Sequence, residues 1–186
     1  MKTFKILLAA LIVLGIANVL TACSPNGASS VGMERIEVAQ VYRKTVELGL
    51  REVNSEDGLT LEIVVSNPEG KALSSAQVWL AYNPDQLKGL KLDTSDSAFE
   101  LMAPYENDFD EELGLVMLGR STESAISDTE IVLARVSFER LTDGSAMIDA
   151  YDYQLDLSGH TSVNTLVEGE PVNVLLQPES PLYVIK

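Results

Sequence analysis

The chain has 186 residues, of which 28 are acidic and 13 basic, and its formal net charge is −15 at pH 7. Such a negative surface repels phosphate-rich partners, which argues against binding to nucleic acid or to anionic lipid headgroups. The single cysteine excludes an internal disulfide, and the single histidine without a cysteine cluster provides no zinc site.

The first 22 residues have the pattern of an export signal. Lys2 and Lys5 precede an apolar stretch over residues 6–20, which is shorter than the ~20 residues a membrane-spanning helix needs. The stretch ends in Leu20-Thr21-Ala22-Cys23, which resembles the lipobox of bacterial lipoproteins. This resemblance implies cleavage before Cys23 and attachment of lipid to its thiol. An ordinary signal peptide with a chance cysteine and an uncleaved anchor are the alternatives.

The chain is therefore expected to have three parts: a signal peptide over residues 1–22, a lipidated tether over 23–32, and one domain over 33–186. The tether consists mostly of small residues, so the domain would lie near the membrane. We expect it on the exported side of the cell envelope. In a cell with two membranes, Ser24 resembles a signal for the outer membrane; otherwise the outer face of the plasma membrane is expected.

The rest of the chain alternates apolar and polar residues with the period of a β-strand. The pattern is longest over residues 59–65, 76–82, 132–138 and 172–176, the third with Val132, Ala134, Val136 and Phe138 on one face. Shorter candidates are residues 36–41, 46–50, 113–119, 146–150 and 182–185. Turn residues separate these segments, and the final apolar segment is expected to cover a sheet edge. Short strands at this spacing predict an all-β sandwich or barrel.

One pair of segments resembles the cohesin family. Residues 58–65 lead through a turn into residues 73–87, where a strand ends in Tyr82-Asn83-Pro84-Asp85 and is followed by Leu87. The likeness continues over residues 115–119, 131–138 and 172–174, so it covers roughly residues 34–176. It implies a jelly-roll β-sandwich of about nine strands. It also implies a non-catalytic module without a cofactor, since cohesins bind dockerins and assemble polysaccharide-degrading complexes.

The chain departs from the family at positions that face the partner. Cohesins of the first type present Asn and Asp in the strand before the Tyr-Asp-Pro motif, whereas this chain has Ser75 and Gln77 there. An acidic residue usually follows the strand that matches residues 115–119, but Arg120 stands at this place. These differences argue against a standard dockerin and leave an exported, dockerin-like protein as the expected partner.

Strand parity predicts the binding face. If Val78, Leu80 and Tyr82 point into the core, Trp79 must point outward together with Gln77. An outward tryptophan is typical of a binding surface. On the strand over residues 115–119 we expect Leu115, Met117 and Gly119 inside, with the alternate residues outside. The predicted partner-binding residues are Ser75, Gln77, Trp79, Val116, Leu118 and Arg120.

Two further features are an acidic run and the single histidine. Asp108, Asp110 and Glu112 alternate in an acidic run and could offer oxygens to calcium, although a solvated loop is the alternative. His160 lies in a predicted loop, where we expect it to make turn contacts and not to act in catalysis.

Two functions remain open on this basis. The first is a surface module that holds a protein and is linked to polysaccharide binding or degradation. The second is a carbohydrate-binding module that holds polysaccharide directly. The second would need Tyr105, Tyr151 or Tyr153 on the same face as Trp79, because flat glycan-binding faces use several aligned rings.

Overall fold

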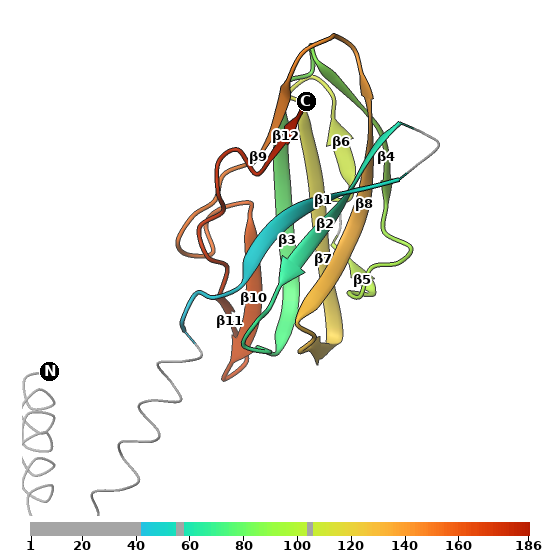
Figure 1. Cartoon of the computed structure of the whole chain (residues 1–186). Coiled ribbons are helices and arrows are strands. Elements are labelled where there is room, and N and C mark those ends of the chain that lie inside the picture. Colours follow the sequence, from blue (N-terminus) through green and yellow to red (C-terminus); the bar gives the residue numbers. More distant parts are fainter. Residues whose placement is uncertain (1–41, 55–57, 104–105) are drawn as a thin grey trace, which may run out of the picture. The chain divides into compact units, whose positions relative to one another are not determined.

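The computed structural model describes residues 42–54, 58–103 and 106–186, and these form a β-sandwich without helices (Figure 1). One sheet has four strands in the order β1-β2-β8-β4, and the other has eight strands, with β11-β10-β3-β7-β5 as its main path. Every ladder between named strands is antiparallel. Within this described part, no helix could cross a membrane. The all-β sandwich expected from the sequence is confirmed.

The strands of the four-stranded sheet are β1 (Glu47–Val53), β2 (Leu59–Ser66), β8 (Glu130–Arg140) and β4 (Leu87–Asp93). Those on the main path of the eight-stranded sheet are β11 (Glu170–Asn173), β10 (Ser162–Val167), β3 (Leu73–Tyr82), β7 (Leu115–Ile126) and β5 (Leu101–Met102). Off this path, β6 (Asp108–Asp110) pairs with β7, β9 (Ala146–Ala150) pairs with β3, and β12 (Tyr183–Ile185) pairs with β9.

The inner faces of the two sheets meet in one apolar core. From β3, Val78 and Leu80 have no exposed surface, as predicted from their alternation. Phe138 lies at the centre, with its ring edge-on to Tyr82 at 5.2 Å and to Phe109 at 6.4 Å between ring centroids. Burying each such side chain contributes about 1.5–3 kcal/mol. This shared core fixes which residues of each strand face outward.

The Tyr-Asn-Pro motif makes the turn after β3. The Asn83 side-chain oxygen accepts a hydrogen bond from the backbone N–H of Asp85 at 2.9 Å, and its carbonyl accepts from the N–H groups of Gln86 and Leu87. Tyr82 is buried at the edge of the core. The motif therefore has the structural role expected for it, and it leads the chain into the opposite sheet.

The described residues form twelve strands, where about nine were expected. Three of the extra segments, β5, β6 and β12, are only two or three residues long. The segment over residues 36–41 and the predicted boundaries at residues 22 and 32 lie outside the described residues. The final apolar segment covers a sheet edge as predicted, because β12 pairs with β9 and buries Ile185 in the core.

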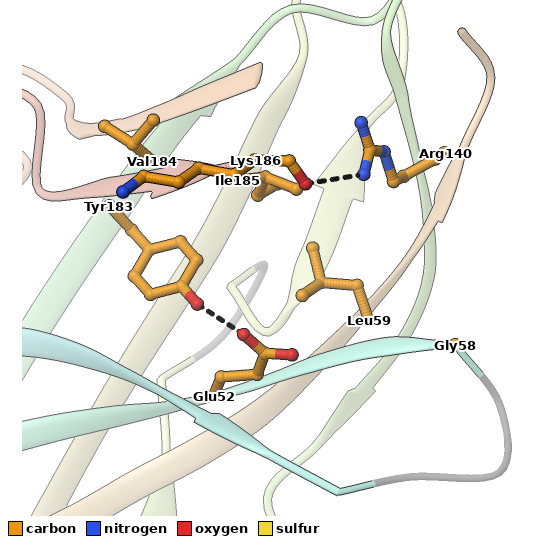
Figure 2. Close-up of a pocket in the computed structure, with 8 residues that line it drawn as sticks. All are labelled: Glu52, Gly58, Leu59, Arg140, Tyr183, Val184, Ile185 and Lys186. Carbon is orange, nitrogen blue, oxygen red and sulfur yellow. Dashed lines mark hydrogen bonds between the residues drawn. The ribbon is translucent and has the colours of Figure 1, made fainter. Parts of the chain in front are cut away.

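A cleft of about 420 Å³ lies beside β12 (Figure 2). The Tyr183 hydroxyl donates a hydrogen bond to the Glu52 carboxylate at 2.7 Å, which ties β12 to β1. The Arg140 guanidinium donates to the carbonyl of Lys186 at 2.9 Å. These contacts hold the end of the chain in place, so we assign the cleft a structural role.

Candidate binding face on the eight-stranded sheet

The edge of β3 changes its pairing partner at Trp79. β10 pairs with β3 as far as Gln77, and β9 pairs with it from Leu80 onward. In the gap, the Trp79 N–H donates to the hydroxyl of Thr161 at 3.2 Å, and the Trp79 carbonyl accepts from the N–H of Tyr151 at 2.7 Å. The loop that connects β9 to β10 therefore leaves the sheet directly beside Trp79.

Three rings gather at this break and form what we call the aromatic cluster: Trp79, Tyr151 and His160. The His160 ring lies 4.1 Å from the Trp79 ring between centroids, tilted by 37°. The Tyr151 ring lies 6.1 Å from Trp79 with an interplanar angle of 18°. Trp79 is half-buried, whereas its neighbours Val78 and Leu80 are fully buried. This difference in burial confirms that the Trp79 side chain points outward.

The loop that supplies Tyr151 and His160 is held by polar contacts. The His160 ring nitrogen Nδ1 lies 2.6 Å from the Asp152 carboxylate, and this hydrogen bond lowers the pKa of Asp152. The buried Asn173 amide donates to the carbonyls of Gln154 and Asp156. His160 makes the loop contacts expected of it, but 43% of its side chain is exposed.

The other end of the same face is polar. Gln77 donates to the Glu106 carboxylate at 2.6 Å, and Asn164 of β10 donates to the Ser75 hydroxyl at 3.1 Å. Gly119 of β7 lies opposite Gln77, and a methyl group there would collide with the Glu106 carboxylate. The predicted outward residues Ser75 and Gln77 thus share one face with Trp79. Glu106 joins them through a contact between distant segments, which no local sequence pattern predicts.

The predicted orientation of β7 is wrong. Val116 and Leu118 have no exposed surface and belong to the core. Arg120 is only 8% exposed, and its guanidinium donates to the carbonyl of Phe99 at 2.6 and 2.9 Å. Met117, which lies opposite Trp79 in the ladder, takes the outward place instead. The apolar centre of the face therefore consists of the aromatic cluster and Met117.

The acidic run borders this face, and its carboxylates are not grouped in the way that the predicted calcium site would need. Asp108 and Asp110 alternate with Phe109, whose ring packs on the core. Asp110 accepts hydrogen bonds from the N–H groups of Glu112 and Leu113, so it stabilises the β6–β7 turn. Within the described ranges, no three His, Cys, Asp or Glu side chains are grouped to hold a metal ion. Asp108 lies opposite Met117, which extends the outer face with negative charge.

Comparison with known proteins relates this architecture to one fold. No protein-family model matches the sequence, and no curated protein has a similar sequence. Among solved structures, a type II cohesin domain from the cellulosome of Acetivibrio cellulolyticus superposes with a TM-score of 0.53 and 19% identity, over 77% of this chain and 95% of that one. A type I cohesin from Pseudobacteroides cellulosolvens gives 0.52 and 14%, over 72% and 87%. A type I cohesin–dockerin complex from Clostridium thermocellum gives 0.50 and 15%, over 70% and 93%. The described domain therefore has a cohesin-like fold.

Proposed function

We propose that the domain is a non-catalytic docking module that holds an exported, dockerin-like protein on the outer face of its eight-stranded sheet. The observation that carries this proposal is the aromatic cluster with Met117 on the outer face of a cohesin-like sandwich. Exposed apolar groups with a polar rim are typical of protein interfaces, and tryptophan is enriched among the residues that dominate binding. The contact set is Ser75, Gln77, Trp79 and Met117, with Met117 in place of the buried Val116 and Leu118.

The fold supports a protein partner of the dockerin kind. The Clostridium thermocellum cohesin with a similar fold was solved in complex with a dockerin. In this chain, Ser75 and Gln77 stand where cohesins of the first type present Asn and Asp, so the partner's contacting residues would differ from those of a standard dockerin. Serine is shorter than asparagine, and glutamine is neutral where the family has an aspartate. We therefore propose a partner whose contacting residues fit Ser75 and Gln77.

A capture experiment with matched variants tests this function. The full chain in a non-ionic detergent would be used as bait for the exported proteins of its own cell, beside Trp79→Ala and Lys88→Ala. Lys88 is exposed on the four-stranded sheet and provides the control. One protein should bind the wild type and Lys88→Ala and lose about 2 kcal/mol or more of binding free energy with Trp79→Ala. A partner held equally by all three baits would contradict the docking face.

Direct polysaccharide binding, with a link to polysaccharide degradation, is the second candidate. The nearly parallel rings of Trp79 and Tyr151 favour it, since sugar rings stack on such pairs. The His160 ring lies over Trp79, however, and Tyr153 directs its hydroxyl to the carbonyl of Leu175. Tyr105 lies outside the described residues. Electrophoresis in gels that contain a soluble glucan or xylan decides: retardation that Tyr151→Ala abolishes would favour this second function over protein docking.

The lipobox-like sequence supports a location on the exported side of the envelope, with lipid on Cys23 as the membrane anchor. Cys23 lies outside the described residues, so this part of the proposal rests on the sequence. The change Cys23→Ala removes the thiol that takes the lipid. We expect an unprocessed precursor that incorporates no fatty-acid probe in cells. Normal labelling of that variant would contradict lipidation at Cys23.

A further inference from the structure

A small hollow of about 230 Å³ lies at the polar end of the same outer face. Its polar lining includes Ser75, Gln77, Glu106, Arg120, Ser121 and Asn164. We propose that this hollow receives one basic side chain, a lysine ammonium or an arginine guanidinium, from the docked protein. The inference rests on the proposed docking function and specifies which chemical group the partner must present.

The first argument is a buried acceptor without a donor. Asn164 is only 8% exposed, and its amide nitrogen lies within hydrogen-bonding distance of the Ser75 and Ser162 hydroxyls. Its side-chain oxygen Oδ1 is buried and has no hydrogen-bond partner among the described residues. A buried acceptor without a donor is destabilising and is unusual in a folded protein. A donor supplied by the partner would satisfy it.

The second argument is an uncompensated negative charge. The Glu106 carboxylate accepts a hydrogen bond from Gln77 at one oxygen and lies against Gly119 with the other. In the part of the chain that the structure describes, Glu106 makes no ion pair with a lysine or an arginine. Hydrogen bonds to an ionised group are about twice as strong as neutral ones, so a cationic donor gains most here.

The third argument is that the one basic residue lining the hollow, Arg120, is already engaged within the domain. Arg120 is the only basic residue within the named strands of the eight-stranded sheet. Within the described ranges, its guanidinium donates both of its hydrogen bonds to the carbonyl of Phe99, and none to Glu106. The neighbouring charges on the outer face, Asp108 and Asp110, are also negative. The field at the hollow therefore attracts a cation and repels a carboxylate or phosphate.

The groups that line the hollow also exclude other occupants. A metal ion would need several converging carboxylates or imidazoles, and the described residues contain no such group. An apolar side chain would leave the Asn164 oxygen and the Glu106 carboxylate without donors. A basic side chain brings several N–H donors and a positive charge, which matches what the hollow lacks.

Four short peptides test this preference directly. They are capped tetrapeptides of identical sequence except for one position, which is arginine, lysine, norleucine or glutamate. Titrated into the isotope-labelled full chain in non-ionic detergent, the arginine and lysine peptides should shift the side-chain amide signals of Gln77 and Asn164. We expect saturation at concentrations at least tenfold below that of any norleucine effect, and no shift with glutamate.

The matched variants are Glu106→Gln, which removes the charge and keeps the shape, and Asp143→Asn, which makes the same change at an exposed turn. Glu106→Gln should weaken binding of the arginine peptide at least tenfold, and Asp143→Asn should not. Equal shifts with norleucine, or equal binding by both variants, would overturn the proposal. If a captured partner needs Trp79 but binds Glu106→Gln like the wild type, the docking function stands and the basic-side-chain site fails. If Trp79→Ala also retains the partner, the docking function itself fails.

Discussion

The outer faces of the two sheets differ in whether their acidic side chains are paired with arginines. On the four-stranded sheet, the Glu62 carboxylate lies between two guanidinium groups, 2.7 Å from Arg51 and 3.1 Å from Arg135. Arg51 also reaches Glu130 at 2.9 Å, and Arg135 pairs with Asp96. The charges at the centre of this face are therefore satisfied within the domain.

On the outer face of the eight-stranded sheet, the described acidic side chains are not paired with basic ones. Glu106, Asp108, Asp110 and Asp149 make no ion pair with a lysine or an arginine among the described residues. Asp108 lies opposite Met117 in the ladder, and Glu106 accepts a hydrogen bond from Gln77. Both sheets consist of antiparallel ladders, and their outer faces differ in how the charged side chains are paired. The charges of one face are paired within the domain, and the face with unpaired charges is the one that we propose for docking.

The largest expected effect on stability tests which side of β7 faces the core. Leu118→Ala should cost about 2–5 kcal/mol of unfolding free energy, because it leaves a cavity in the core. Its neighbour Met117 is partly exposed, so Met117→Ala should cost less than half as much. Urea unfolding of the two variants measures both values. A larger loss for Met117→Ala than for Leu118→Ala would reverse the orientation of β7.

Trp79→Ala should have an intermediate effect on stability. A buried core tryptophan would cost about 3–5 kcal/mol on truncation, but Trp79 is half-buried and, among the described residues, packs on the rings of Tyr151 and His160. We expect a loss of about 1–2 kcal/mol, mostly from the ring contacts with His160 and Tyr151. Urea unfolding gives the value. A loss as large as that of Leu118→Ala would place Trp79 in the core and remove it from the binding face.

The smallest expected effect on stability concerns Glu62 and its two arginine partners on the four-stranded sheet. Hydrogen bonds from Arg51 and Arg135 outweigh burial and lower the pKa of Glu62 below its ordinary value. Glu62→Gln should therefore cost about 1 kcal/mol at neutral pH, since solvent screens the two half-exposed arginines.

The pH dependence of this cost has a defined sign. A lowered pKa in the folded state stabilises the protein above the ordinary value, and the contribution is lost as the pH falls through the folded pKa. The difference in unfolding free energy between wild type and Glu62→Gln should therefore be constant above about pH 5 and decrease in stronger acid. Unfolding measured across this range checks the prediction, and a difference that grows in acid would contradict it.

Much of the fold could be predicted because alternation is strong where one face is buried. In β3 and β2, alternate positions carry large aliphatic residues, so both the strands and their inward faces follow from the sequence. In β7, Leu115, Val116, Met117 and Leu118 are all apolar, so parity alone does not decide which pair is inside. Arg120 then suggests the wrong side, since its burial depends on the distant carbonyl of Phe99.

Other features could not be predicted because the strand ladders contain irregularities. The register between β2 and β8 shifts at Ile63 and Val64, so Val132 is half-exposed while Leu133 joins the core, contrary to the simple alternation. The aromatic cluster depends on the change of partner along β3, which brings His160 and Tyr151 to Trp79 across the sequence. Local sequence contains no signal for either feature, because both arise from contacts between distant strands.

Site-specific cross-linking in the cell tests the central claim most directly. A photoreactive phenylalanine derivative would replace Met117 in one full-length variant and Lys88 in another, so that each outer face carries one probe. We predict that irradiation yields one discrete cross-linked protein from position 117 and none from position 88, and that Trp79→Ala removes it. A discrete product from position 88 with none from position 117 would contradict docking on the eight-stranded sheet.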